Sequence, residues 1–229
     1  MNLTILAIGS RGDVQPCVAL GAGLRRAGHE VRVVTLESFE TMVRGQGLDF
    51  LPVAGDAQAL VNTMLAGKKG AGGLCLLPMY RAILRSFGAI VDDYRRALAD
   101  ERLRDADAIL SQLPGGLFGY DLSEALGVPY IALSVIPQET TAAWPLALLP
   151  GRRSLGGTYN RLTYRLGQQL VWRAFRPAVN GFRAQLGLGP AGFWEGNMGR
   201  MRREKTPVVQ GFSERVVPRP PDCWRPQAT

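Results

Sequence analysis

The sequence predicts an α/β protein built on a doubly wound parallel sheet. Residues 3–8 (LTILAI) form a continuous apolar run, the polar loop 9–13 follows, and a helix-like stretch then extends to Gly28. This order of strand, loop and helix recurs along the chain, and strands covered on both faces of a parallel sheet are typically apolar throughout. Right-handed crossovers between such strands place helices on both faces of the sheet.

The remaining elements follow the same alternation. Apolar runs predict further strands at 31–35, 48–53, 108–111, 130–135 and 206–210. Helical spacing of apolar residues predicts helices at 39–45, at 78–99, in the stretch that ends at Leu126, and at 159–186. The glycine-rich segment 67–73 and the proline-containing segment 136–157 are expected to be loops. The length and apolar patches of 136–157 are typical of a binding loop.

The composition is that of one globular domain. Hydrophobic residues make up 46% of the 229 residues and charged residues 20%, which is an ordinary balance. We expect residues 1–214 to form a single domain and the proline-rich residues 215–229 to form a linker. No apolar stretch approaches the roughly 20 residues that cross a bilayer, and the N-terminus lacks the features of a secretory signal. A cytoplasmic location is therefore expected.

The net charge of +8 favours anionic partners. The arginines between 152 and 205 lack the interleaved aromatic residues of a nucleic-acid-binding module, so nucleic acid is not expected as a partner. Five arginines fall on the predicted helix 159–186: Arg161, Arg165, Arg173, Arg176 and Arg183. They form either a solvated helix face or a surface that binds the anionic inner face of a membrane.

The histidine and cysteine content disfavours several kinds of catalytic site. The single histidine, His29, directly precedes a predicted strand, whereas ligands of open parallel sheets bind at the carboxyl ends of strands. We therefore interpret His29 as a turn residue, which disfavours Ser-His-Asp catalysis, Cys-His catalysis and multi-histidine metal sites. Cys17, Cys75 and Cys223 form no CxxC pair, so neither a disulfide framework nor a bound metal is expected.

The loop after the first predicted strand is the best candidate for a functional site, because backbone amides at a helix N-terminus can bind an anion or a polar reacting group. Its sequence, GSRGD at 9–13, matches neither GxGxxG nor GxxxxGK[ST]. Nicotinamide dehydrogenases and P-loop NTPases thereby lose their main support.

This loop begins a longer motif, GSRGDVQP at 9–16, which closely resembles the opening of the GT-B glycosyltransferases of the sterol glucosyltransferase and antibiotic-biosynthesis branch. Further similar segments are AGHEV at 27–31, EALGVP at 124–129, LGL at 186–188, GFS at 211–213 and VPRP at 217–220. The resemblance covers nearly the whole chain. Its first motif is specific, whereas the glycine turns are common to many α/β proteins.

The resemblance implies a Rossmann-like domain that is the N-terminal, acceptor-binding half of a GT-B fold. Such enzymes are inverting transferases that move a hexose from a nucleotide sugar, by default a UDP-sugar, to a hydroxyl of a lipophilic acceptor such as a sterol, lipid or natural product. The donor-binding half is expected outside this chain, which alone should be inactive, and no metal or other cofactor is expected. The alternative is a non-catalytic acceptor-binding or membrane-recruiting subunit of a two-chain transferase.

Asp13 occupies the position of the catalytic base in the family that the chain resembles. A base takes the proton from the acceptor hydroxyl as it attacks the anomeric carbon. The other interpretation is that Asp13 only caps the following helix, with Pro16 in its first turn.

Five further residues are candidates for substrate binding. Ser10 and Arg11 lie in the first loop, where they could contact the acceptor or the donor phosphates, and Gly12 would let the backbone approach a ligand. Gln112 follows a predicted strand, and Trp144 lies in the predicted binding loop, where it could equally be an ordinary core tryptophan.

Overall fold

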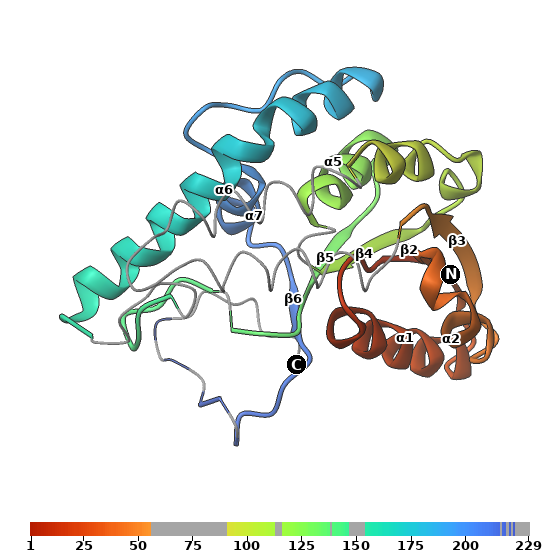
Figure 1. Ribbon diagram of the computed structural model, residues 1–229, viewed down its shortest axis with the longest axis horizontal. Coiled ribbons are helices and arrows are strands. Elements are labelled where there is room, and N and C mark those ends of the chain that lie inside the picture. Colours follow the sequence, from red (N-terminus) through yellow and green to blue (C-terminus); the bar gives the residue numbers. More distant parts are fainter. Residues whose placement is uncertain are drawn as a thin grey trace.

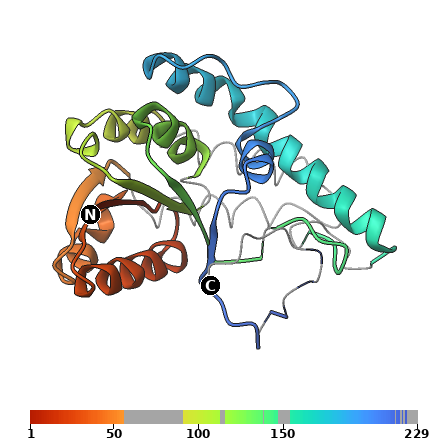
Figure 2. The same cartoon turned by 180° about the vertical axis from the view of Figure 1, so that it is seen from behind.

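The computed structural model describes residues 1–55, 91–112, 116–137, 139–146, 154–215, 217–218, 220 and 222. These residues form one sheet with helices on both faces (Figures 1 and 2). The strands are β1 (Asn2–Leu6), β2 (Glu30–Leu36), β3 (Asp49–Val53), β4 (Ala108–Gln112), β5 (Tyr130–Ser134) and β6 (Val208–Gln210). The helices are α1 (Arg11–Arg26), α2 (Glu40–Arg44), α5 (Gly116–Leu126), α6 (Gly157–Gln185) and α7 (Asn197–Arg203), with short 3-10 turns η1 (Glu37–Phe39) and η2 (Glu101–Leu103) and a helical segment at 91–98.

The strands pair in the order β3-β2-β1-β4-β5-β6, and every pairing is parallel. The prediction of a doubly wound parallel sheet is confirmed, as are all six predicted strands to within one or two residues at most boundaries. The strand order reverses between β1 and β4, which are direct neighbours in the register Leu3 to Ala108 and Leu6 to Ser111. Ligands of open α/β sheets bind at such a reversal, outside the carboxyl ends of the strands.

The core lies between the sheet and the helices on its two faces. α1 and α2 cover one face and α5 covers the other (Figure 1). α1 buries one stripe at helical spacing, consisting of Val14, Cys17, Val18, Gly21 and Ala22. α5 approaches the opposite face closely at Gly119, where a β-carbon would lie 2.8 Å from Leu6 Cδ1. This contact fixes α5 directly over the junction of β1 and β4.

Ion pairs join α5, α6 and α7 beside the sheet. Arg183 Nη1 donates to Asp121 Oδ1 at 2.5 Å and to Glu124 Oε2 at 2.7 Å. Asn197 Nδ2 donates to Asp121 Oδ2 at 2.8 Å, and Arg200 Nη2 donates to Glu124 Oε2 at 2.6 Å. The prediction that Arg183 belongs to a solvated basic face is therefore wrong. Its side chain is only 6% exposed and forms an ion pair with the fully buried Asp121.

α7 was not predicted from the sequence. The described part of the predicted helix 78–99 is helical at 91–98, whereas residues 78–90 and the glycine-rich segment 67–73 lie outside the described residues. The described parts of the expected loop 136–157 contain no strand, and helix only at Gly157. The expected linker contacts the domain at Asp222, whose carboxylate accepts hydrogen bonds from Thr141 Oγ1 and the Ala142 amide. Across the described ranges, no helix is long and apolar enough to span a membrane.

Candidate active site at the carboxyl edge of the sheet

The turn between β1 and α1 is shorter than predicted. α1 begins at Arg11, with Ser10 in an extended conformation as its N-cap, so only residues 7–10 connect it to β1. Gly9 makes this turn with a φ of 151°, a backbone conformation that side chains other than that of glycine rarely allow. The turn lies at the carboxyl end of β1, beside the point where the strand order reverses.

The Asp13 carboxylate folds back over this turn. Its Oδ2 accepts a hydrogen bond from the Ser10 amide at 2.7 Å and another from Ser10 Oγ at 2.8 Å. This is the arrangement of a capping box, in which an acidic side chain in the first helical turn binds the backbone of the N-cap residue. Capping by Asp13 is thus present in the structure, whereas its role as a base stays a prediction.

Gly9 leaves the space that the Asp13 carboxylate fills. A β-carbon at Gly9 would lie 2.5 Å from Asp13 Oδ2 and 2.8 Å from Cγ, closer than atoms pack. Gly12, in contrast, lies within α1, where an added β-carbon would meet only Ser10 Oγ, at 3.6 Å. Glycine is therefore required at Gly9, whereas close approach of the backbone to a ligand at Gly12 stays a prediction.

Arg11 and Gln112, two of the predicted site residues near this turn, differ in solvent exposure. Arg11 is exposed, and its Nε donates to Gln15 Oε1 at 3.2 Å, one helical turn along. Gln112 is fully buried at the end of β4, and its Nε2 donates to the Ile8 carbonyl at 2.8 Å. Gln112 therefore ties the carboxyl end of β4 to the segment that leads into the Ser10 turn. Substrate contact by either residue stays a prediction.

Trp144 belongs to a different part of the chain. It is half-buried in the segment 139–146, which is attached to α6: Asn160 Nδ2 donates to the Ala142 carbonyl at 2.7 Å, and the Leu146 amide donates to Thr163 Oγ1 at 2.9 Å. The structure thus brings Ser10, Asp13 and Gln112 together at one edge of the sheet. The segment that carries Trp144 is bonded to α6 through Ala142 and Leu146, and within the described residues Trp144 makes no hydrogen bond to that group.

Cys17 lies one helical turn after Asp13 and faces the core. Burial, together with the nearby negative charge of Asp13, raises the pKa of its thiol to about 12. Since the thiolate is the reactive form, we expect Cys17 in the native protein to resist iodoacetamide at pH 8, and to react after unfolding in urea. Mass-spectrometric mapping of the Cys17 peptide measures this, and alkylation of the native protein at the rate of the unfolded chain would contradict the buried placement.

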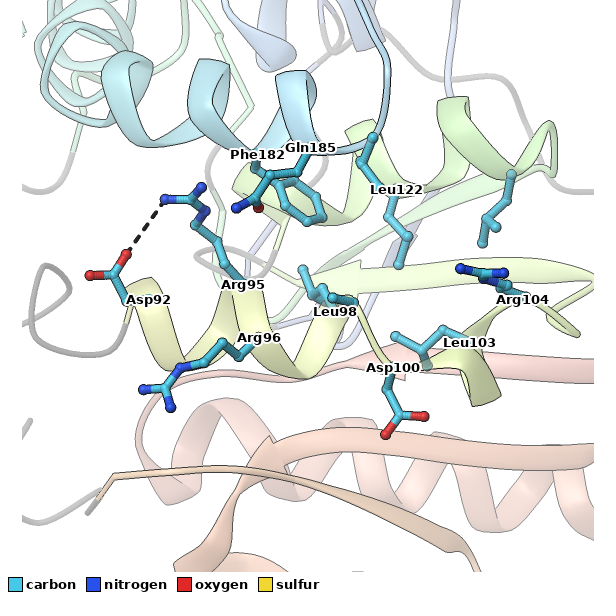
Figure 3. Close-up of a pocket in the computed structure, with 13 residues that line it drawn as sticks. Asp92, Arg95, Arg96, Leu98, Asp100, Leu103, Arg104, Leu122, Phe182 and Gln185 are labelled. Carbon is cyan, nitrogen blue, oxygen red and sulfur yellow. Dashed lines mark hydrogen bonds and ion pairs between the residues drawn. The ribbon is translucent and has the colours of Figure 1, made fainter.

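A cavity of about 400 Å³ opens elsewhere, between the helical segment 91–98, α5 and α6 (Figure 3). Its floor is apolar, with Leu98, Leu122 and Phe182, and arginines including Arg95 line it. Leu103, which also lines it, precedes β4, so the cavity lies toward the amino ends of the strands. It contains none of the predicted site residues, and the reversal of strand order therefore remains the better candidate for chemistry.

Comparison with known proteins finds similar sequences for nearly the whole chain. Residues 3–104 match the glycosyltransferase family 28 N-terminal domain. The chain is 34% identical to the sterol 3-beta-glucosyltransferase of Emericella nidulans over 223 residues, which is 97% of this chain and 15% of that protein. It is 33% identical to the sterol 3-beta-glucosyltransferase of Cryptococcus neoformans var. neoformans over 225 residues, which is 98% of this chain and 13% of that protein. The chain thus spans only a small part of the length of these relatives.

A solved structure shares the fold. The glycosyltransferase VinC, in complex with DTDP, aligns with a TM-score of 0.50 and 14% identity, covering 92% of this chain and 49% of that one. At this identity the likeness bears on the fold alone, and it agrees with the Rossmann-like parallel sheet described above. Residues 3–104 therefore match the glycosyltransferase family 28 N-terminal domain, the fold corresponds to the N-terminal half of GT-B structures, and nearly the whole chain is similar in sequence to part of the sterol 3-beta-glucosyltransferases.

Proposed function

We propose that this chain is the acceptor-binding domain of an inverting glycosyltransferase that moves a hexose from a nucleotide sugar to a hydroxyl of a lipophilic acceptor such as a sterol. The observation that carries this proposal is the alignment of 97% of the chain, at 34% identity, with a sterol 3-beta-glucosyltransferase. The position of Asp13 at the reversal of strand order supports it, because this is where open α/β sheets bind their ligands.

In this proposal Asp13 is the general base. Both of its described hydrogen bonds end on Oδ2, so Oδ1 is the oxygen that would accept the proton of the acceptor hydroxyl. Ser10 holds the carboxylate in place, and Gly9 leaves it room. A base fixed in this way needs no reorientation when the acceptor binds, which is the condition for efficient proton transfer.

The nucleotide sugar, by default UDP-glucose, would bind a second domain outside these 229 residues, and no metal would take part. The relatives are several times longer than this chain, which leaves room in them for such a domain. The division of roles predicts that binding of acceptor and donor can be separated experimentally.

We expect the 229-residue chain to bind a sterol but not the donor. Titration with a fluorescent sterol should give saturable binding, whereas calorimetric titration with UDP-glucose should release little heat, because the pocket for the nucleotide is not in this chain. A micromolar dissociation constant for UDP-glucose would refute the division of roles. Absence of any sterol binding would refute the lipophilic acceptor.

A further inference from the structure

α6 has an unusual charge distribution for a helix of its length. Its 29 residues include five arginines and no aspartate or glutamate. Arg183 is neutralised by buried acids, and Arg161 pairs with Asp222 at 2.9 Å. Arg165 and Arg173 are exposed, and within the described residues neither has an acidic partner. Among the residues that the structure describes, Arg165 and Arg173 are therefore exposed positive charges that no carboxylate neutralises.

The outer face of α6 also exposes a stripe of leucines. Leu162, Leu166 and Leu170 are 49%, 56% and 41% exposed, and their spacing of four residues places them on one side of the helix. Arg173, three residues after the last leucine, continues the same side. α6 extends well beyond the edge of the sheet, so its first half is far from the core (Figures 1 and 2). Contiguous exposed apolar side chains of this kind mark an interaction surface.

Two aromatic residues lie beside this stripe. Phe193 and Trp194 are 45% and 71% exposed, and their rings meet edge to face at 5.0 Å. The guanidinium of Arg173 lies 4.9 Å from the centre of the first ring and 5.1 Å from the centre of the second. The pair is held in place, because the buried Trp172 donates its indole N–H to the carbonyls of Gly192 and Phe193. An exposed tryptophan on a fixed backbone suits a boundary between water and an apolar phase.

We propose that this surface, formed by the leucine stripe of α6, Arg165, Arg173 and the Phe193–Trp194 pair, docks on a bilayer that contains anionic phospholipid. The leucines and Trp194 would enter the headgroup region, and the arginines would pair with lipid phosphates. This combination of an apolar face, an interfacial tryptophan and unpaired cations is the signature of a helix that lies in a membrane interface. The inference goes beyond sugar transfer and does not depend on the role of Asp13.

The charge of the surface argues against a second copy of the chain as its occupant. A symmetric dimer places the same patch on both subunits, so the arginines of one copy would face those of the other. Like charges are already close here: burial and then the positive charge of Arg165 lower the pKa of Arg202 on α7. An anionic bilayer relieves this repulsion, whereas a second copy would increase it.

The test is co-sedimentation of the 229-residue chain with vesicles of phosphatidylcholine, with or without phosphatidylserine. We expect binding to the anionic vesicles to be at least about tenfold stronger, and to weaken between low and high salt, since each arginine near such a surface contributes about 1 kcal/mol that salt screens. Arg165→Gln with Arg173→Gln should remove most of the preference for anionic lipid. Leu166→Gln with Trp194→Ala should weaken binding to vesicles at every salt concentration.

A matched control removes the same charge elsewhere. Arg26 and Arg104 are exposed on other parts of the domain, so Arg26→Gln with Arg104→Gln should lower binding much less than the α6 double variant. The proposal would be overturned if the chain bound neutral and anionic vesicles equally, or bound neither. It would also be overturned if the α6 arginine double variant and the Arg26/Arg104 double variant lost the same amount of binding. Light scattering tests the alternative of a dimer. If the chain is a dimer, does not bind vesicles, and becomes a monomer on Leu166→Gln, the surface binds a second copy of the chain instead.

Discussion

Asp13→Asn is expected to lower kcat by roughly 10²- to 10⁴-fold in a transferase that contains this domain together with its donor-binding domain, because general base catalysis typically contributes that much. Asparagine has the size of aspartate and an oxygen that can still accept the hydrogen bond of the Ser10 amide, but it cannot take a proton from the acceptor. Steady-state kinetics with the acceptor varied would show the loss chiefly in kcat.

The controls separate catalysis from capping. Ser10→Ala removes the 2.8 Å bond from Ser10 Oγ but keeps the amide bond and the carboxylate. It should cost about 1 kcal/mol of stability and lower kcat much less than Asp13→Asn does, because the carboxylate remains and the Ser10 amide still holds it. Asp13→Ala should lower both stability and kcat, since it removes the cap as well as the base. If Asp13→Asn melts normally, binds donor and turns over within a few-fold of the parent, Asp13 is only a cap and the chain is an acceptor-binding module.

The fold was predictable because its strands are short, apolar and separated by glycine turns. β1 and β4 are almost wholly buried, so their sequences are mostly apolar, although Thr4 lies inside β1 and Ser111 and Gln112 end β4. α7 had a much weaker signal: its sequence, NMGRMRR, offers only Met198 and Met201 for an apolar face. Tertiary contacts stabilise it instead, since Asn197 Nδ2 donates to the Leu117 carbonyl and to Asp121. Such contacts with a distant helix are invisible to local pattern analysis.

The candidate site was predictable only in part. The motif at 9–16 located Ser10 and Asp13, but the spatial reason for Gly9, the space taken by the carboxylate, depends on how Asp13 folds back. The burial of Gln112 likewise depends on its bond to the Ile8 carbonyl across the sheet. Arg183 was wrongly assigned to an exposed helix face, because its sequence context is the same as that of the exposed arginines on α6. The acids at Asp121 and Glu124, three residues apart on α5, were the signal that it had partners.

Arg183→Met is expected to destabilise the domain by about 3–5 kcal/mol, the usual cost of removing one partner from a buried ion pair. Arg183 makes two bonds to Glu124, one to Asp121 and a 2.6 Å bond from Nε to the Gly189 carbonyl. Methionine fills the space of the aliphatic stem but leaves Asp121 charged and fully buried, with Asn197 and a longer contact to Arg200 as its remaining partners. A domain of this size loses about 2–4 °C in Tm per kcal/mol, so Tm should fall by roughly 6–20 °C.

Two further variants show whether the stranded charge is the cause. Arg203→Met removes an arginine that is 58% exposed and pairs with Glu195 and Glu204, and a surface pair of this kind contributes at most about 1 kcal/mol. Adding Asp121→Asn to Arg183→Met removes the unpaired charge, so the double variant should regain part of the lost stability. Denaturation of the parent, the two single variants and the double variant gives the coupling energy between the two residues. If Arg183→Met and Arg203→Met cost the same, or if Asp121→Asn adds its full cost to the Arg183 variant, the Asp121–Arg183 pair does not hold α6 against α5.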